Sequence, residues 1–173
     1  MKKKLNNKKT SNSFFFNCPA CNKKGFSVEQ RIDTIPYLGE VLETFAKCKY
    51  CKYKTHDILP LTEKDYPKKH KIKISKQKDL ERRVIKGKYC TIKVPEIELE
   101  IDPGPGSESY ISNLEGVIDR IIYSLKRIKK LKKEEKKIDK KIKLLESAKN
   151  QKKEITIIFE DPTRQSVVLK NFK

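Results

Sequence analysis

Two pairs of closely spaced cysteines constrain this chain more than any other feature of its sequence. Cys18 and Cys21 frame the stretch CPAC, Cys48 and Cys51 frame the stretch CKYC, and residues 22–47 separate the pairs. Two residues between cysteines allow one tight turn to aim both sulfurs at a single ion, and two such turns supply the four ligands that tetrahedral zinc prefers. We therefore predict that these four cysteines bind one zinc ion.

The same cysteine spacing also occurs in redox dithiols, iron–sulfur sites and disulfides, which remain the alternatives. The chain starts with MKKK and polar residues rather than the apolar core of a signal peptide, so we expect a cytoplasmic protein whose thiols stay reduced. A shell of four sulfurs leaves no position for a bound water, which predicts a structural metal. We interpret Cys90 as a small buried residue and His56 as a surface histidine rather than as ligands.

The chain of 173 residues carries 42 lysine and arginine residues against 23 aspartate and glutamate residues, a formal net charge of +19. The excess is uneven, because residues 1–13 carry +5 and residues 113–153 carry +9. Only six of the basic residues are arginine, the side chain best shaped for bidentate phosphate contacts. A compositional preference for lysine is thus one explanation of the charge, although nonspecific, salt-sensitive nucleic-acid binding is expected of so basic a chain.

Composition and periodicity divide the chain into three parts. Residues 1–13 are polar and lysine-rich, and we predict a disordered basic tail. Residues 14–61 hold the cysteine pairs and form the predicted zinc finger, with room between the pairs for an extra hairpin or short helix. Residues 62–173 form the predicted β domain, in which the runs HKIKISK, RRVIKGKYCTIKV and IELEIDP are expected to be strands of an antiparallel sheet.

The apolar period changes within about residues 113–150 and predicts an amphipathic helix with its N-cap at Ser112 or Asn113. One straight helix over this span would be about 50 Å long, so we predict a helical hairpin that turns near residues 132–137. Because EITIIFEDP and QSVVLKNF follow as strands, the helices are interpreted as an insertion into one β domain. The apolar stripe comprises Leu114, Val117, Ile118, Ile121, Ile122, Leu125 and Ile128, and continues with Ile138, Ile142 and Leu145.

Motifs along nearly the whole chain resemble those of the ZPR-type zinc-finger family, in particular its single-module archaeal members. The matching stretches are CPAC, IPYLGEV, CKYC, DLERRVIK, PEIELEIDPGPGS, LEGVI and FEDPTRQS. The resemblance implies a mainly β fold with inserted α: a four-cysteine zinc finger joined to a double-stranded β-helix (jelly-roll-like) domain that carries a helical hairpin insertion. In two places the chain departs from the family. Lys52 replaces a usual glycine, which predicts a different turn in the second cysteine pair, and Arg164 and Gln165 replace glycine and asparagine.

The resemblance also implies a function. Eukaryotic relatives bind translation elongation factor 1-alpha and assist its folding, so we expect a non-enzymatic, zinc-binding interaction module that acts as a binding or folding and assembly factor for that GTPase. Within IPYLGEV, the candidate partner-binding residues are Pro36, Tyr37, Leu38 and Glu40. Packing of the finger onto the β domain is the other explanation for this segment. The alternative function is a nucleic-acid-binding zinc ribbon that uses the lysine-rich tail and the helical hairpin.

An enzyme is the class of function that the sequence supports least. The predicted β domain contains one histidine, His70, whereas a metal site of two histidines and one carboxylate needs two. The chain has no GxxxxGK phosphate loop. It also has too few histidines to support a Ser/His/Asp catalytic triad. Asp161, which precedes a proline, is interpreted as a turn former. We therefore expect neither catalytic residues nor a membrane-spanning segment.

Overall fold

The computed structural model describes residues 14–35, 39–61, 66–104, 106–130 and 135–169. The predicted basic tail, residues 1–13, lies outside the described residues. The chain divides into two compact units, residues 1–64 and residues 65–173. Among the described helices, none is long and apolar enough to cross a bilayer.

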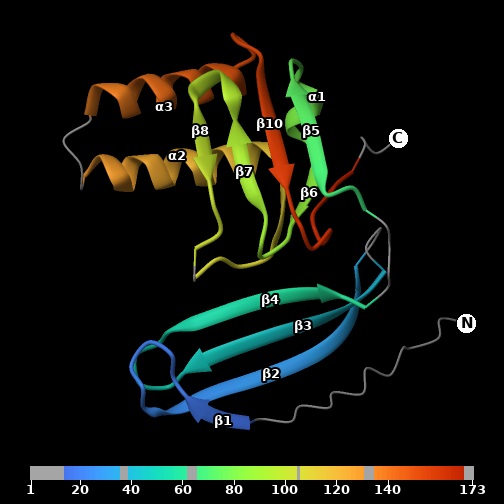
Figure 1. Cartoon of the computed structure of the whole chain (residues 1–173), viewed down its shortest axis with the longest axis vertical. Coiled ribbons are helices and arrows are strands. Elements are labelled where there is room, and N and C mark those ends of the chain that lie inside the picture. Colours follow the sequence, from blue (N-terminus) through green and yellow to red (C-terminus); the bar gives the residue numbers. More distant parts are fainter. Residues whose placement is uncertain (1–13, 36–38, 62–65, 105, 131–134, 170–173) are drawn as a thin grey trace, which may run out of the picture. The chain divides into compact units, whose positions relative to one another are not determined.

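The first unit is an antiparallel sheet with the strand order β1-β2-β3-β4 (Figure 1). Its strands are β1 (Phe14–Asn17), β2 (Lys24–Ile35), β3 (Gly39–Cys48) and β4 (Lys54–Pro60). The segment between the cysteine pairs is a long hairpin of β2 and β3, which pair from Phe26 opposite Cys48 to Ile35 opposite Gly39. The connections from β1 to β2 and from β3 to β4 lie at one end of this sheet, and they carry the two cysteine pairs.

In its described residues, the second unit contains two antiparallel sheets and two long helices. One sheet has the order β5-β10-β7-β8, and the other has the order β11-β6-β9. The strands are β5 (Lys69–Ile74), β6 (Arg83–Lys86), β7 (Thr91–Val94), β8 (Leu99–Ile101), β9 (Tyr110–Asn113), β10 (Ile155–Glu160) and β11 (Val167–Val168), with short helical turns α1 (Gln77–Leu80) and η1 (Pro95–Ile97). The predicted mainly β fold with inserted helices is confirmed.

The strands form where apolar and charged residues alternate, but the run RRVIKGKYCTIKV is not one strand. It splits into β6 and β7, which belong to different sheets, with Gly87 at the break. A Cβ atom on Gly87 would lie 2.4 Å from Oδ2 of Asp161, so no larger residue fits at this point. Strand β9, directly before the helices, is an element that the sequence pattern does not predict.

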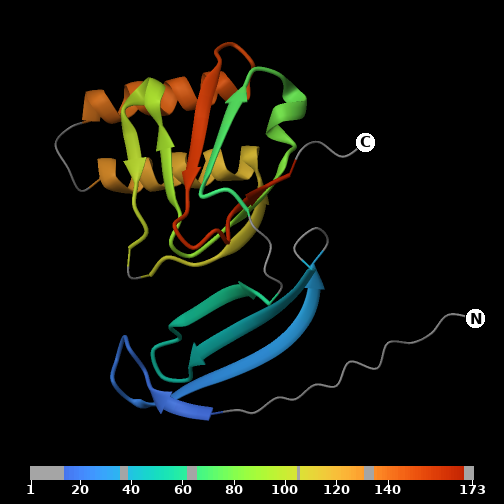
Figure 2. The ribbon, with the colours of Figure 1, turned by 45° about the vertical axis from the view of Figure 1, so that its right-hand side comes forward.

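Helices α2 (Leu114–Lys129) and α3 (Glu135–Lys149) form a hairpin that lies across one face of the four-stranded sheet (Figures 1 and 2). Asn113 caps α2, because its side-chain oxygen accepts a hydrogen bond from the backbone N–H of Gly116 at 2.8 Å. The predicted stripe is buried against the strands, except for the exposed Ile128. The predicted turn extends too far, since residues 135–137 are already helical; residues 131–134 lie outside the described residues.

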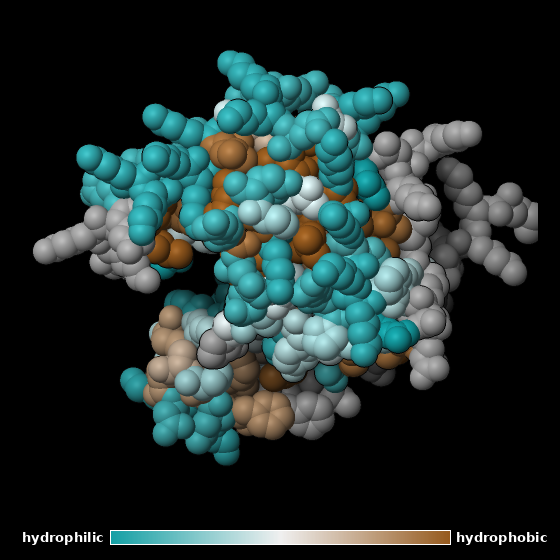
Figure 3. All heavy atoms as spheres, turned by 45° about the horizontal axis from the view of Figure 1, so that its top comes forward, coloured by the Kyte–Doolittle hydropathy of each residue, from teal (hydrophilic) through white to brown (hydrophobic). Residues whose placement is uncertain are grey.

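Lysines surround this apolar core on the outside of the second unit. Figure 3 shows hydrophilic side chains projecting from much of the visible surface, with patches of apolar residues among them. Several helix lysines form ion pairs between α2 and α3: Lys129 Nζ lies 2.8 Å from Asp139, and Lys149 Nζ lies 2.6 Å from Asp119. Part of the positive charge of the hairpin is therefore neutralised locally.

A buried hydrogen-bond network joins the two sheets of the second unit at Asp161, immediately after β10. The Asp161 carboxylate accepts hydrogen bonds from Oγ of Ser166 and Oγ1 of Thr163, both at 2.6 Å, and from the Thr163 backbone N–H at 2.9 Å. Ser166 Oγ in turn accepts a hydrogen bond from the backbone N–H of Gly87, which follows β6. Burial alone would raise the pKa of Asp161, but these hydrogen bonds outweigh it and lower the pKa.

We predict that Asp161→Asn destabilises the chain by about 2 kcal/mol at neutral pH, because an amide offers only one acceptor oxygen to three donors. The folded-state pKa of Asp161 lies below its unfolded value of roughly 3.9. The carboxylate's stabilisation is therefore complete above about pH 5 and is lost as the pH falls through the folded-state pKa. Urea unfolding should give free energies of unfolding that differ strongly between variant and wild type at pH 7, and this difference should become smaller at acidic pH.

The exposed Asp102 provides the control for this measurement. Asp102→Asn should leave the unfolding midpoint close to that of the wild type at both pH values. An Asp161→Asn variant that loses the same stability in acid as at neutral pH would contradict an ionised, hydrogen-bonded carboxylate.

Candidate metal centre

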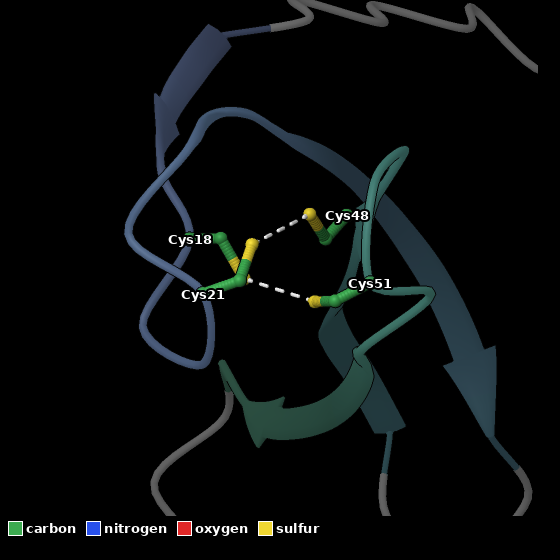
Figure 4. Close-up of side chains that lie close together, drawn as sticks. All are labelled: Cys18, Cys21, Cys48 and Cys51. Atoms are coloured by element: carbon green, nitrogen blue, oxygen red, sulfur yellow. Dashed lines mark hydrogen bonds between the residues drawn. The ribbon is translucent and has the colours of Figure 1, made fainter.

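The four paired cysteines converge in the first unit, and their side chains point toward one another (Figure 4). Their sulfur atoms all lie within 4.8 Å of one another. Cys18 Sγ lies 3.6 Å from Cys51 Sγ, and Cys21 Sγ lies 3.7 Å from Cys48 Sγ. Four sulfurs at about 2.3 Å from a zinc ion are about 3.8 Å apart in a tetrahedron. The arrangement therefore suits one zinc ion, with no position left for a substrate or a water.

Each cysteine pair lies in a turn that directs a backbone N–H at a sulfur. Ala20 N donates to Cys18 Sγ and Tyr50 N donates to Cys48 Sγ, both at 3.4 Å. Hydrogen bonds of this kind favour the thiolate form that zinc requires. Sequence reasoning did not identify Ala20 and Tyr50 as part of the site, although each occupies the same position between two cysteines.

The residue after each pair has a left-handed backbone conformation. Asn22 has a φ of 56° and Lys52 has a φ of 62°. Their backbone N–H groups donate to the carbonyl oxygens of Cys18 and Cys48, at 2.8 and 3.2 Å respectively. The prediction that Lys52 makes the second pair turn differently is therefore wrong. The two turns are alike, and a lysine accepts a φ that its Cβ disfavours.

The four thiols differ in their environments. Cys18 and Cys48 are buried, whereas Cys51 is exposed. Chiefly through a hydrogen bond from the Cys51 backbone N–H, the pKa of the Cys48 thiol is lowered to about 6. At Cys51 the hydrogen bond from the Tyr53 backbone N–H also lowers the thiol pKa. Desolvation and the neighbouring sulfurs outweigh it, so the pKa of Cys51 is raised to about 12. The Cys48 thiol therefore ionises readily, whereas ionisation of Cys51 is favoured by a cation bound beside the sulfurs.

His56 and Cys90, which we interpret from the sequence as residues other than ligands, lie outside this cluster. His56 is on β4, where its ring stacks on Phe45 with centroids 4.2 Å apart, and its Nε2 is 3.9 Å from Oε1 of Glu43. The imidazole is half-buried, so it is less exposed than the surface histidine that the sequence predicts. Cys90 is buried immediately before β7, in the second unit, as predicted.

The candidate partner-binding residues are only partly described. Pro36, Tyr37 and Leu38 lie outside the described residues, between β2 and β3. Glu40 is exposed near the start of β3, and its backbone carbonyl accepts a hydrogen bond from Leu61 N. Glu40 therefore lies at the end of the β2–β3 hairpin that is remote from the cysteine pairs.

We predict that Lys52→Gly strengthens the metal site, because glycine adopts a positive φ without the penalty of about 1 kcal/mol that a Cβ brings. Zinc affinity, measured by competition with a chromogenic chelator, should rise about fivefold. Lys54→Gly is the matched control. Lys54 lies in β4 without a positive φ, so glycine there should not tighten zinc binding. A Lys52→Gly variant with weaker zinc binding would contradict strain at this turn.

We also predict one zinc ion per chain in reduced, purified protein. Cys18→Ser and Cys48→Ser should each abolish stoichiometric zinc as measured by elemental mass spectrometry, whereas Cys90→Ala should retain it. Removal of zinc by a chelator should expose the amides of β2 and β3 to hydrogen exchange and leave β10 protected, because binding of the ion is coupled to folding of the finger. Retention of zinc in Cys48→Ser would contradict the four-sulfur site.

Comparison with known proteins places this site and fold in a family. The ZPR1 jelly-roll domain model matches residues 78–173, which confirms the predicted fold class. A ZPR1-like protein of Pyrococcus horikoshii is 35% identical over 159 residues, covering 88% of this chain and 71% of that protein.

Two further relatives extend the comparison to a second archaeon and to a eukaryote. A ZPR1-like protein of Methanocaldococcus jannaschii is 36% identical over 156 residues, 88% of this chain and 78% of that protein. The zinc finger chaperone zpr1 of Schizosaccharomyces pombe is 29% identical over 119 residues, 68% of this chain but 25% of that protein. Given the matching domain and the identity across most of its length, this chain belongs to the ZPR1 family.

Proposed function

We propose that this chain is a zinc-binding interaction module that binds a protein client and assists its folding or assembly, and that the client is translation elongation factor 1-alpha. The names of its relatives, a zinc finger chaperone and zinc finger proteins, support a chaperone rather than an enzyme. The identity of the client rests on the resemblance of the sequence motifs to those of eukaryotic relatives. In this proposal Cys18, Cys21, Cys48 and Cys51 are structural zinc ligands that hold the finger rigid.

Exposed apolar side chains on the finger carry this proposal. Ile32 on β2 is 63% exposed and Leu59 on β4 is 44% exposed. Leu42 on β3 lies directly opposite both, so the three residues form one row across a single face of the sheet. Leu61, also exposed, continues this face beyond β4. Apolar side chains gathered at the surface of a small unit are typical of a surface that binds another protein.

The row lies at the end of the hairpin where the IPYLGEV motif connects β2 to β3. Ile35 and Gly39 are the last paired residues of that hairpin, and residues 36–38 follow directly. We propose that Pro36, Tyr37, Leu38 and Glu40 contact the client together with this row, since a few anchor residues, tyrosine prominent among them, supply most of the binding energy at protein interfaces. The zinc ion, at the opposite end of the sheet, holds the strands that present them.

Binding of purified elongation factor 1-alpha to the zinc-loaded chain tests the proposal. The double variant Ile32→Thr, Leu59→Thr keeps β-compatible side chains but removes the apolar row, and we expect its affinity to fall about tenfold or more, as measured by calorimetry. Ile111→Thr on β9 is the matched control, because Ile111 is 41% exposed on a strand of the other unit. It should bind like the wild type.

Two results would contradict the proposal. If the wild-type chain does not bind the elongation factor at low or at physiological salt, whether nucleotide-free or loaded with GDP or GTP, the client is wrong. If the double variant binds normally while Ile111→Thr binds weakly, the client contacts a different surface.

A further inference from the structure

The lysines of the finger are concentrated at its cysteine end. Residues 15–28 and 45–56 contain six lysines and no aspartate or glutamate, whereas residues 29–44 contain four acidic residues and one arginine. Four thiolates and one zinc ion together carry two negative charges, so the six lysines still leave an excess of four positive charges at this end. These lysines are Lys23, Lys24, Lys47, Lys49, Lys52 and Lys54.

None of the six forms an ion pair with an acidic residue in the described part of the chain. Lysines of the helical hairpin differ in this respect, because Lys129 and Lys149 are paired with Asp139 and Asp119. Lysines without acidic neighbours are the ones whose charge is available to the phosphates of a nucleic acid. The lysines at the cysteine end of the finger are therefore more available to bind phosphates than the paired lysines of the helical hairpin.

Strand register places several of these side chains in one row across the sheet. Phe15 on β1 lies opposite Ser27 on β2, Ser27 lies opposite Lys47 on β3, and Lys47 lies opposite Lys54 on β4. Cross-strand partners point to the same face of a sheet. Phe15 is 60% exposed and both lysines are exposed, so one face at this end presents an aromatic ring in the same row as two cations.

A second ring, that of Tyr50 in the second cysteine turn, lies at the same, cysteine-bearing end of the finger. It packs on Gly25, where a Cβ atom would lie 2.6 Å from ring carbon Cε2, and Gly25 precedes Ser27 by two positions on β2. The Nζ atoms of Lys23 and Lys49 lie 5.5 and 4.9 Å from the centroid of this ring, which remains half exposed.

We propose that this knuckle face, formed by Phe15, Lys23, Lys47, Lys49, Tyr50 and Lys54, binds single-stranded nucleic acid. The lysines contact backbone phosphates, and unpaired bases stack on Tyr50 and Phe15. Exposed aromatic rings within a groove or patch of cations are how single strands are bound without sequence preference, because every base has a flat face to stack. A duplex keeps its bases inside the helix and leaves both rings without a partner.

The proposal is independent of the elongation-factor client. The apolar row of Ile32, Leu42 and Leu59 occupies the other end of the finger and the opposite face, since Leu42 and Lys47 are an odd number of residues apart on β3. It also differs from a nucleic-acid function of the tail and the helical hairpin, because it depends on two aromatic rings rather than on charge alone.

Fluorescence anisotropy with the full zinc-loaded chain tests the proposal. The probes are labelled oligouridine and oligothymidine of about 12 nucleotides and a duplex of the same length, each titrated over a series of salt concentrations. We expect the single strands to bind more tightly than the duplex. Tyr50→Leu should weaken their binding roughly tenfold, because leucine is apolar but cannot stack, and Tyr50→Phe should bind like the wild type.

Charge is tested separately with matched pairs of substitutions. Lys47→Gln with Lys54→Gln should reduce the slope of log affinity against log salt by about 1.4, since each phosphate contact to a single strand contributes about 0.7. Lys136→Gln with Lys140→Gln removes the same charge from exposed positions on α3 and should leave affinity and slope close to wild type. Zinc content is measured for each variant, and Phe15→Leu replaces Tyr50→Leu if the latter loses zinc.

Any of four results would overturn the proposal. The first is unchanged oligonucleotide binding by a zinc-loaded Tyr50→Leu or Phe15→Leu variant. The second is an equal loss of affinity in the α3 lysine pair and the finger lysine pair. The third is binding of the duplex as tight as binding of the single strands. The fourth is a Tyr50→Leu variant that weakens binding of the elongation factor but not of the oligonucleotides, which would show that a protein occupies the knuckle face.

Discussion

Closure of the four-sulfur shell is the constraint on which the finger depends. It brings Cys18 within 3.6 Å of Cys51 although 33 positions separate them in sequence. Apart from its cysteines, the described part of this unit fully buries few apolar side chains, namely Val41, Ala46 and Ile58. A unit this small cannot bury enough apolar surface to be stable by packing alone. Zinc binding, worth about 10–16 kcal/mol in zinc-finger peptides, compensates for the small core.

The second unit is stabilised by packing instead of by metal. Helices α2 and α3 are inserted between β9 and β10, and their buried stripes pack with Ile155, Ile157 and Phe159 of β10. Because β10 lies between β5 and β7, the strand after the insertion completes a sheet begun before it. Asn113 is both the last residue of β9 and the N-cap of α2, so strand passes into helix without a loop. The insertion therefore covers the sheet without interrupting it.

The alternation and periodicity of apolar residues predicted the elements whose own sequence determines which face is buried. The alternation of KIKIS and the stripe from Leu114 identified β5 and α2, and the repeated spacing identified all four cysteines of the cluster. The split of RRVIKGKYCTIKV and the existence of β9 depend on pairing between distant segments and on the contact of Gly87 with Asp161. A single sequence carries no signal for such pairing. The knuckle face was likewise out of reach, because only strand register places Phe15 and Lys54 in one row.

The residue after each cysteine pair has a left-handed backbone, and it shows why the backbone preference of a residue type did not predict the turn at the metal site. A lysine is disfavoured at positive φ, which is why Lys52, in place of a usual glycine, was expected to change the turn of the second cysteine pair. Both turns nevertheless form the same hydrogen bonds and have φ values of 56° and 62°. The two turns must each present two sulfurs to one ion, and the energy of that closure exceeds the backbone penalty of a single lysine by about an order of magnitude. At such a site the geometry of the metal determines the backbone, and the residue adapts to it.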